Sequence, residues 1–128
     1  VPFAGSAACR GCHTAQWEQW NSSDHAGAWN TLVDAGRQLD LACFECHVTG
    51  AHHPEGPTHP NNVGILTGVG RESCHGPRAA HVGAASSGAL DEHRDVQEVS
   101  LETCIQCHDG DRDDGDFDPT TYMESVRH

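Results

Sequence analysis

The feature that most constrains this chain is the pentapeptide C-x-x-C-H, which occurs three times in 128 residues. Its copies stand at residues 9–13, 43–47 and 104–108. A disulfide framework would leave one of the seven cysteines over, and it gives no reason for a histidine after each pair. Zinc sites built from paired cysteines do not require that histidine either. The repeated histidine therefore points to a different cofactor.

C-x-x-C-H is the attachment signature of c-type haem. Two thiols form thioethers with the porphyrin, and the adjacent histidine binds the iron as its proximal ligand. The three motifs therefore predict three covalent haems. The residues that would hold them are Cys9, Cys12, Cys43, Cys46, Cys104 and Cys107 for attachment, and His13, His47 and His108 for iron.

A fourth, incomplete copy stands at residues 71–75, where Arg71 occupies the place of the first cysteine. Cys74 and His75 keep one thiol and the proximal histidine, so a haem held by a single thioether is chemically feasible. We predict four haems because the interior would lose a large part of its volume without this one. The alternative is a three-haem protein with a free Cys74. Arg71 is either an exposed arginine or a bidentate partner for a haem propionate.

The composition fits a chain that folds around its cofactors. Only 36% of the residues are hydrophobic, which gives a thin core for 128 residues. Good helix-start residues stand at Ser22 or Ser23 and at Asp118, which precedes a proline. Residues 50–70 have the composition of a loop, and no strand-like alternation is sustained. We predict a mainly α, loop-rich fold in one domain, residues 1–128, with short helices around a packed haem cluster and little or no β structure.

The charge and hydropathy of the chain limit its partners. A formal net charge of −12 argues against nucleic acid, which needs a basic face. It favours redox proteins with basic docking patches. No run of 18 apolar residues occurs, so no transmembrane segment is predicted. Because haem of this covalent type is attached outside the cytoplasm, we expect a periplasmic or extracellular protein whose signal peptide has been removed.

The order of the motifs resembles the multihaem cytochromes of the cytochrome c-554 family. The resemblance rests on FAGSAACRGCHTAQWEQWNSSDHAGAW, CFECHVTG, LTGVGRESCHGP, and CIQCH followed by FDPTTYMESVRH. GVGxESCHGP is the most specific of these segments. In that family the position of Arg71 is normally a cysteine that completes a fourth motif. The resemblance implies a tetrahaem cytochrome, and the departure at Arg71 concerns the attachment chemistry there.

The resemblance also implies distal ligands, on the opposite side of the iron, for three of the four haems. They come from a segment after the first motif, from the segment after CHGP, and from the last residue of the chain. The implied pairs of distal and proximal histidines are His81 with His13, His25 with His108, and His128 with His75.

The resemblance does not fix a distal ligand for the haem at His47, because some family members leave its iron five-coordinate. The loop that follows offers His52, His53 and His59. His52 and His53 are close to His47 in sequence, whereas His59 has a longer tether. We rank His59 and His53 ahead of an open position, and a ligand from a neighbouring subunit is a further alternative.

The acidic segment DGDRDDGDFD, residues 109–118, invites a calcium interpretation. An EF-hand loop needs glycine at its sixth position and glutamate at its twelfth. Counted from Asp109, these positions hold Asp114 and Thr120. A solvated acidic loop is therefore the prediction, with a looser calcium site as the alternative.

Electron transfer is the function that these features predict, and no catalytic residue is assigned. An iron bound by two histidines has no open position for a substrate, and closely packed haems pass electrons between them. One alternative is a small haem enzyme that acts on nitrogen oxides or hydroxylamine at a five-coordinate iron. Another is a subunit of an extracellular cytochrome filament, formed by head-to-tail contacts that do not close.

Overall fold

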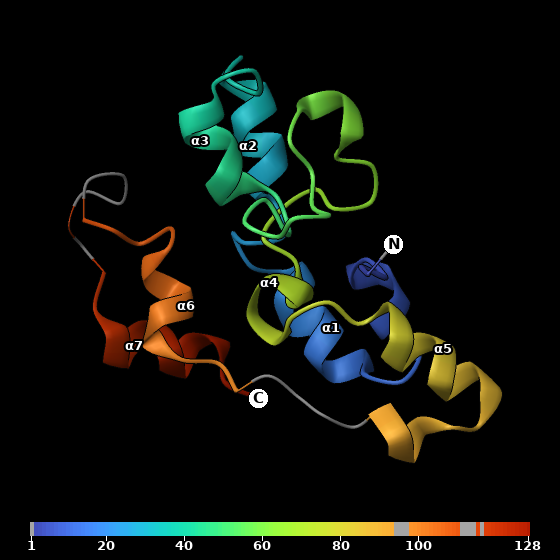
Figure 1. Ribbon diagram of the computed structural model, residues 1–128. Coiled ribbons are helices and arrows are strands. Elements are labelled where there is room, and N and C mark those ends of the chain that lie inside the picture. Colours follow the sequence, from blue (N-terminus) through green and yellow to red (C-terminus); the bar gives the residue numbers. More distant parts are fainter. Residues whose placement is uncertain (1, 94–97, 111–114, 116) are drawn as a thin grey trace.

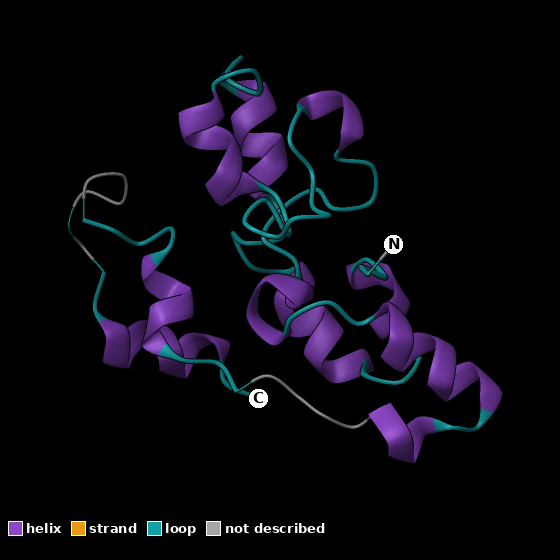
Figure 2. Ribbon diagram, viewed as in Figure 1, coloured by secondary structure: helices purple, strands orange, loops and turns teal. Residues whose placement is uncertain are grey.

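The computed structural model describes residues 2–93, 98–110, 115 and 117–128. In these ranges the chain forms short helices joined by loops, and its β structure is one isolated bridge between Val48 and Thr67 (Figures 1 and 2). The predicted mainly α, loop-rich fold is confirmed. The α-helices are α1 (Thr14–Asn21), α2 (Ala28–Asp34), α3 (Leu41–His47), α4 (Arg71–His75), α5 (Ala79–Ser87), α6 (Leu101–Ile105) and α7 (Pro119–Val126), and the 3-10 helices are η1 (Ser6–Cys9), η2 (Pro60–Asn62) and η3 (Leu90–His93).

Segments from distant parts of the sequence reach α4: the Ala4 and Gly5 N–H groups donate to Glu72, and the His128 ring lies against His75. Figure 1 shows α2 and α3 packed side by side at one end, and α6 with α7 at another side of the molecule. The chain end that follows α7 returns to the middle of the molecule, close to α4 (Figure 1). The end of the chain is therefore brought next to its central incomplete motif. None of the described helices is long and apolar enough to cross a membrane.

The start of α7 is as predicted. Pro119 is its first residue, and the Asp118 carboxylate accepts a hydrogen bond of 3.1 Å from the Thr120 N–H. This arrangement combines the favoured N-cap side chain with the favoured first helical residue.

The predicted helix start at Ser22 or Ser23 is wrong. Both hydroxyls instead donate to carbonyls at the end of α1, Ser22 to Glu18 at 3.0 Å and Ser23 to Trp20 at 2.5 Å. The next helix, α2, begins only at Ala28. Serine hydroxyls serve either end of a helix because they both donate and accept hydrogen bonds.

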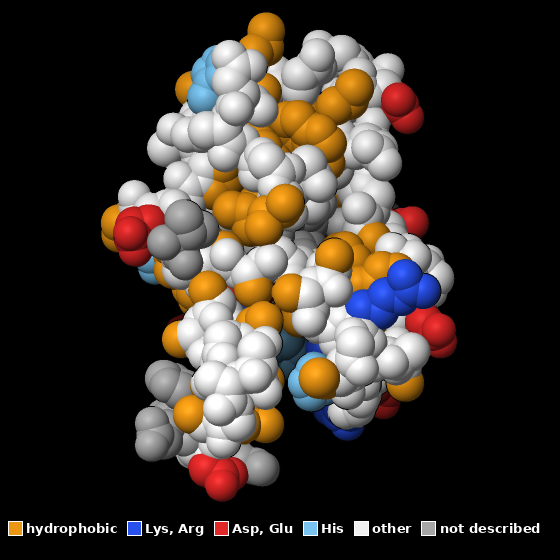
Figure 3. Space-filling model, turned by 90° about the vertical axis from the view of Figure 1, so that its right-hand side faces the viewer, with side chains coloured by type: hydrophobic (Ala, Val, Ile, Leu, Met, Phe, Trp, Pro, Cys, Tyr) orange, Lys and Arg blue, Asp and Glu red, His pale blue; other side chains and the backbone are white. Residues whose placement is uncertain are grey.

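The side-chain core is small, as the composition predicts. It lies between α3 and the loop that follows, and consists of Phe3, Phe44, Val48, Val63 and Leu66. Helices α6 and α7 contribute no buried residue to it. Large apolar side chains are exposed instead, among them Leu39 at 69% and Ile65 at 67%, and Figure 3 shows hydrophobic patches on one face. The described polypeptide alone therefore leaves much apolar surface uncovered.

We expect the melting temperature to rise with salt, because acidic side chains outnumber basic ones by 19 to 7. In the described part of the chain, Arg37 and Asp40 form the one ion pair, at 2.6 Å, between an exposed arginine and a partly exposed aspartate. Raising ionic strength from 0.01 M to 1 M shortens the screening length from about 30 Å to about 3 Å, which weakens the self-repulsion of the folded state. Far-UV circular dichroism melts should show an increase of about 5 °C or more. KCl should act like NaCl, and a melting temperature that falls with both salts would contradict this prediction.

Candidate functional site

The second motif lies entirely in helix α3. Its cysteines, Cys43 and Cys46, are three residues apart and so share a face of the helix. The Nδ1–H of His47 donates to the Ala28 carbonyl at 2.5 Å. Because a carbonyl oxygen only accepts, this contact fixes the tautomer and leaves Nε2 available as a metal ligand.

The first and last motifs make a similar turn. The backbone N–H of His13 donates to the Cys9 carbonyl at 2.9 Å, and that of His108 donates to the Cys104 carbonyl at 2.9 Å. In each case the histidine is brought back over the first cysteine of its motif. This local geometry needs only the five residues of the motif.

The incomplete motif forms helix α4, and a buried carboxylate ties it to the N-terminal segment. Glu72 is 4% exposed and accepts three backbone hydrogen bonds. The donors are Ala4 at 2.9 Å, Gly5 at 2.7 Å and Arg78 at 2.8 Å. Sequence reasoning missed this residue, although it lies within GVGxESCHGP, the most specific segment of the chain.

The structure brings each of the three implied histidine pairs together. The ring centroids are 6.4 Å apart for His13 and His81, 6.2 Å for His25 and His108, and 5.7 Å for His75 and His128. The members of these pairs are 68, 83 and 53 residues apart in sequence, so the contacts are tertiary.

The spacing within these pairs is suited to one iron between two imidazoles. A metal–nitrogen bond to histidine is about 2 Å long and the ring centre lies about 1 Å beyond the nitrogen, so two opposite ligands have centroids about 6 Å apart. His128 also donates from Nδ1 to the Val126 carbonyl at 3.1 Å, which leaves its Nε2 for a metal. Burial and the neighbouring His108 lower the pKa of His25, which favours the neutral form that binds metal.

His47 has no second histidine ring against it in the described part of the chain. His53 packs edge-on against Phe3 at 5.2 Å, and its Nδ1 accepts from the Glu55 N–H at 3.1 Å. His59 caps η2, and its Nδ1 accepts from the Asn61 N–H at 3.1 Å. An accepting Nδ1 puts the proton of a neutral ring on Nε2, the opposite tautomer from that of His47. His52 is exposed.

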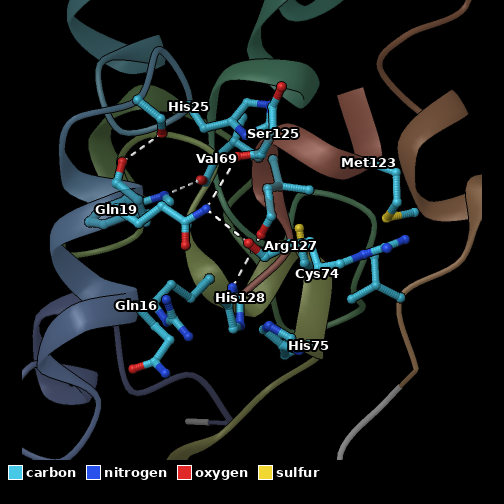
Figure 4. Close-up of a pocket in the computed structure, with 16 residues that line it drawn as sticks. Gln16, Gln19, His25, Val69, Cys74, His75, Met123, Ser125, Arg127 and His128 are labelled. Carbon is cyan, nitrogen blue, oxygen red and sulfur yellow. Dashed lines mark hydrogen bonds between the residues drawn. The ribbon is translucent and has the colours of Figure 1, made fainter. Parts of the chain in front are cut away.

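A cavity of about 250 Å³ lies between α1, α4 and the end of α7, beside the incomplete motif (Figure 4). Cys74, His75 and His128 line it, and Figure 4 shows the two imidazoles next to each other. The Nε2–H₂ of Gln19 donates at 3.2 Å to the carbonyls of Ser125 and Arg127, which holds the chain end over the cavity.

Arg71 lies near two attachment cysteines, Cys9 and Cys74. Burial raises the pKa of the Cys9 thiol, and the positive charge of Arg71 opposes the rise. Burial also raises the pKa of Cys74, where Cys104 adds to the rise and Arg71 again opposes it. Geometry agrees, because Arg71 lines the same cavity as Cys74 and its backbone N–H donates to Ser6 of η1, the 3-10 helix that ends at Cys9.

These residues fit a haem c at each motif. Apolar side chains flank the cysteines and are exposed: Leu41 precedes Cys43, and Leu101 and Ile105 surround Cys104. Large apolar surface of this kind is what a porphyrin would cover. The indole Nε1–H of Trp17 is buried without a hydrogen-bond acceptor in the described chain, and a haem carboxylate would satisfy such a donor.

The calcium alternative concerns a segment that is largely outside the described residues. Of residues 109–118, positions 111–114 and 116 are not described. Elsewhere in the described chain, no group of three or more metal-binding side chains comes together. The calcium site stays a prediction.

Comparison with known proteins gives two matches. The family model of "Cytochrome c554 and c-prime" matches residues 8–76. "Cytochrome c-554" of Nitrosomonas europaea is 36% identical in an alignment 92 residues long, which covers 60% of this chain and 39% of that protein. The chain thus spans about two fifths of the length of this curated relative. No solved structure matches the chain. The family match includes the incomplete motif and ends before the motif at residues 104–108.

Proposed function

The chain belongs to the cytochrome c554 and c-prime family, a family of c-type cytochromes, and from this we propose that residues 1–128 form one tetrahaem electron-transfer domain. A c-type cytochrome carries electrons on covalently bound haem. Our proposal goes beyond this family assignment in the number of haems, the iron ligands and the redox partners.

The three histidine pairs are the observation that carries this proposal. Each pair joins a motif histidine to one from a distant segment, at the spacing of two ligands on one metal. An iron with two protein ligands has no position left for a substrate, which favours electron transfer over catalysis.

The protein's own residues hold and tune the cofactor. When bound, haem supplies a one-electron couple, and the axial ligands, burial and nearby charge set its potential. The motif cysteines fix its position, with Cys74 acting alone in α4. The His47 hydrogen bond to the Ala28 carbonyl orients one proximal ligand and raises its basicity.

A second candidate function is that of a small haem enzyme, which would act at the iron held by His47. No second histidine lies against His47 in the described chain, and His53 and His59 are engaged in contacts of their own loops. This favours a position that a small nitrogen-containing ligand, or a histidine from a second copy of the chain, could fill. Ligation by His59 or His53 would require the loop to release whichever of the two rings binds the iron.

We propose an extracytoplasmic location, in the periplasm or outside the cell, because haem c is attached there. The partners would be redox proteins with basic patches, which complement the charge of −12.

The test is to measure haem content and the electron paramagnetic resonance spectrum on one sample of oxidised holoprotein. We expect four haems per chain, three with low-spin signals and one with a high-spin signal. The high-spin iron should bind carbon monoxide after reduction. Three haems per chain would contradict the tetrahaem proposal. Four low-spin signals in a monomer would instead support His59 or His53, and low-spin signals that turn high-spin on dilution would support a ligand from a second copy.

A further inference from the structure

Arg71 occupies the place of a thioether cysteine, and the structure holds it at the centre of the molecule. Its backbone N–H donates to Ser6 Oγ at 3.0 Å, which ties the start of α4 to η1. Its side chain lines the cavity that contains Cys74 and His75, and its positive charge opposes the rise that burial causes in the pKa of the Cys9 thiol. The arginine therefore lies beside Cys74 and is tied to the 3-10 helix that ends at Cys9, so it is near the attachment points of two haems of the proposed cluster.

The charge of Arg71 is not neutralised by the described polypeptide. No carboxylate of the described residues lies within ion-pair distance of its guanidinium, although the chain has 19 acidic side chains. The adjacent carboxylate, Glu72, is already bonded to three backbone N–H groups. The side chain itself is only partly exposed, which limits screening by solvent.

We infer that Arg71 substitutes a fixed positive charge for the missing thioether and thereby raises the reduction potential of the haem at His75. Reduction adds one negative charge to an iron site, and a nearby cation stabilises that state. Arginine keeps its charge over the whole working pH range, so its effect does not vary with pH. This inference rests on the proposed haem at Cys74.

The test compares Arg71→Gln and Arg71→Lys in the holoprotein by spectroelectrochemical titration. A haem with one thioether keeps one vinyl group in conjugation, so its absorption band is displaced from those of the other haems and reports on this site alone. For Arg71→Gln, we expect the ratio of reduced to oxidised haem at a fixed potential to fall by about tenfold. For a one-electron couple that is a shift of about 59 mV. Arg71→Lys should recover most of the shift.

A matched control removes an arginine elsewhere. Arg37→Gln deletes the same charge from a side chain that is 61% exposed and already paired with Asp40. Arg37→Gln should leave unchanged the reduction potential measured from the displaced absorption band of the haem at His75. Equal shifts of this reduction potential in Arg37→Gln and Arg71→Gln would overturn the inference, because they would reflect only the change in net charge.

Peptide mass analysis separates this inference from the function on which it rests. If the peptide that contains Cys74 carries no haem, both the tetrahaem proposal and the role of Arg71 fail. If the haem is present and Arg71→Gln leaves its potential unchanged, only the inference about Arg71 fails.

Discussion

Replacing His128 with alanine should convert one iron of the oxidised holoprotein from low spin to high spin without loss of covalent haem. The His128 ring faces His75 at 5.7 Å, and its Nδ1–H is already bonded to a backbone carbonyl. His128 is exposed at the chain end, so removing its side chain costs little packing. The expected change in the resonance spectrum is one full haem equivalent, with a matching high-spin band in the absorption spectrum.

Free imidazole provides the rescue for this variant. Added to His128→Ala, it should restore the low-spin signal, because it replaces the missing ligand without restoring the chain end. His52→Ala is the matched control, since it removes an exposed histidine that is not part of a pair, and its spectrum should equal that of the parent protein. An unchanged low-spin signal in His128→Ala would refute ligation by His128.

The sequence predicts most securely what is determined by residues close together in the chain. Cys43, Cys46 and His47 lie within a single helix, so their joint role follows from their spacing. The pair of His25 and His108 spans 83 residues, and it was predicted only through resemblance to a family. Spacing alone offers no means of choosing among seven non-motif histidines.

The two failures of sequence reasoning have physical causes. The serines at 22 and 23 were assigned to the wrong helix end, because a hydroxyl can cap a following helix or bond back to the preceding one. Glu72 was not recognised as a structural centre, because two of its three donors come from residues near the N-terminus. Hydrogen bonds between distant segments leave no periodic signal in the sequence.

Replacing Glu72 should destabilise the protein more than any other acidic substitution in the described chain. Glu72→Ala leaves three backbone N–H groups without their acceptor in a buried site. Bonds to a charged acceptor contribute about 1.5–3 kcal/mol each, and losing such a buried partner costs about 3–5 kcal/mol in total. We expect a loss of this size in the free energy of unfolding, measured on holoprotein by guanidinium titration with circular dichroism. Glu72→Gln should lose less, because its amide oxygen still accepts hydrogen bonds.

The control for Glu72→Ala removes a negative charge at an exposed position of this acidic chain. Glu18→Gln removes the same negative charge from an exposed position in α1. In a chain of net charge −12, that change should be neutral or slightly stabilising at low salt, since it reduces self-repulsion. Opposite signs for the two substitutions would show that Glu72 acts through its hydrogen bonds. If both variants were equally stable, the carboxylate of Glu72 would not hold α4 to the N-terminal segment, and the position of His75 would have to depend on the haem itself.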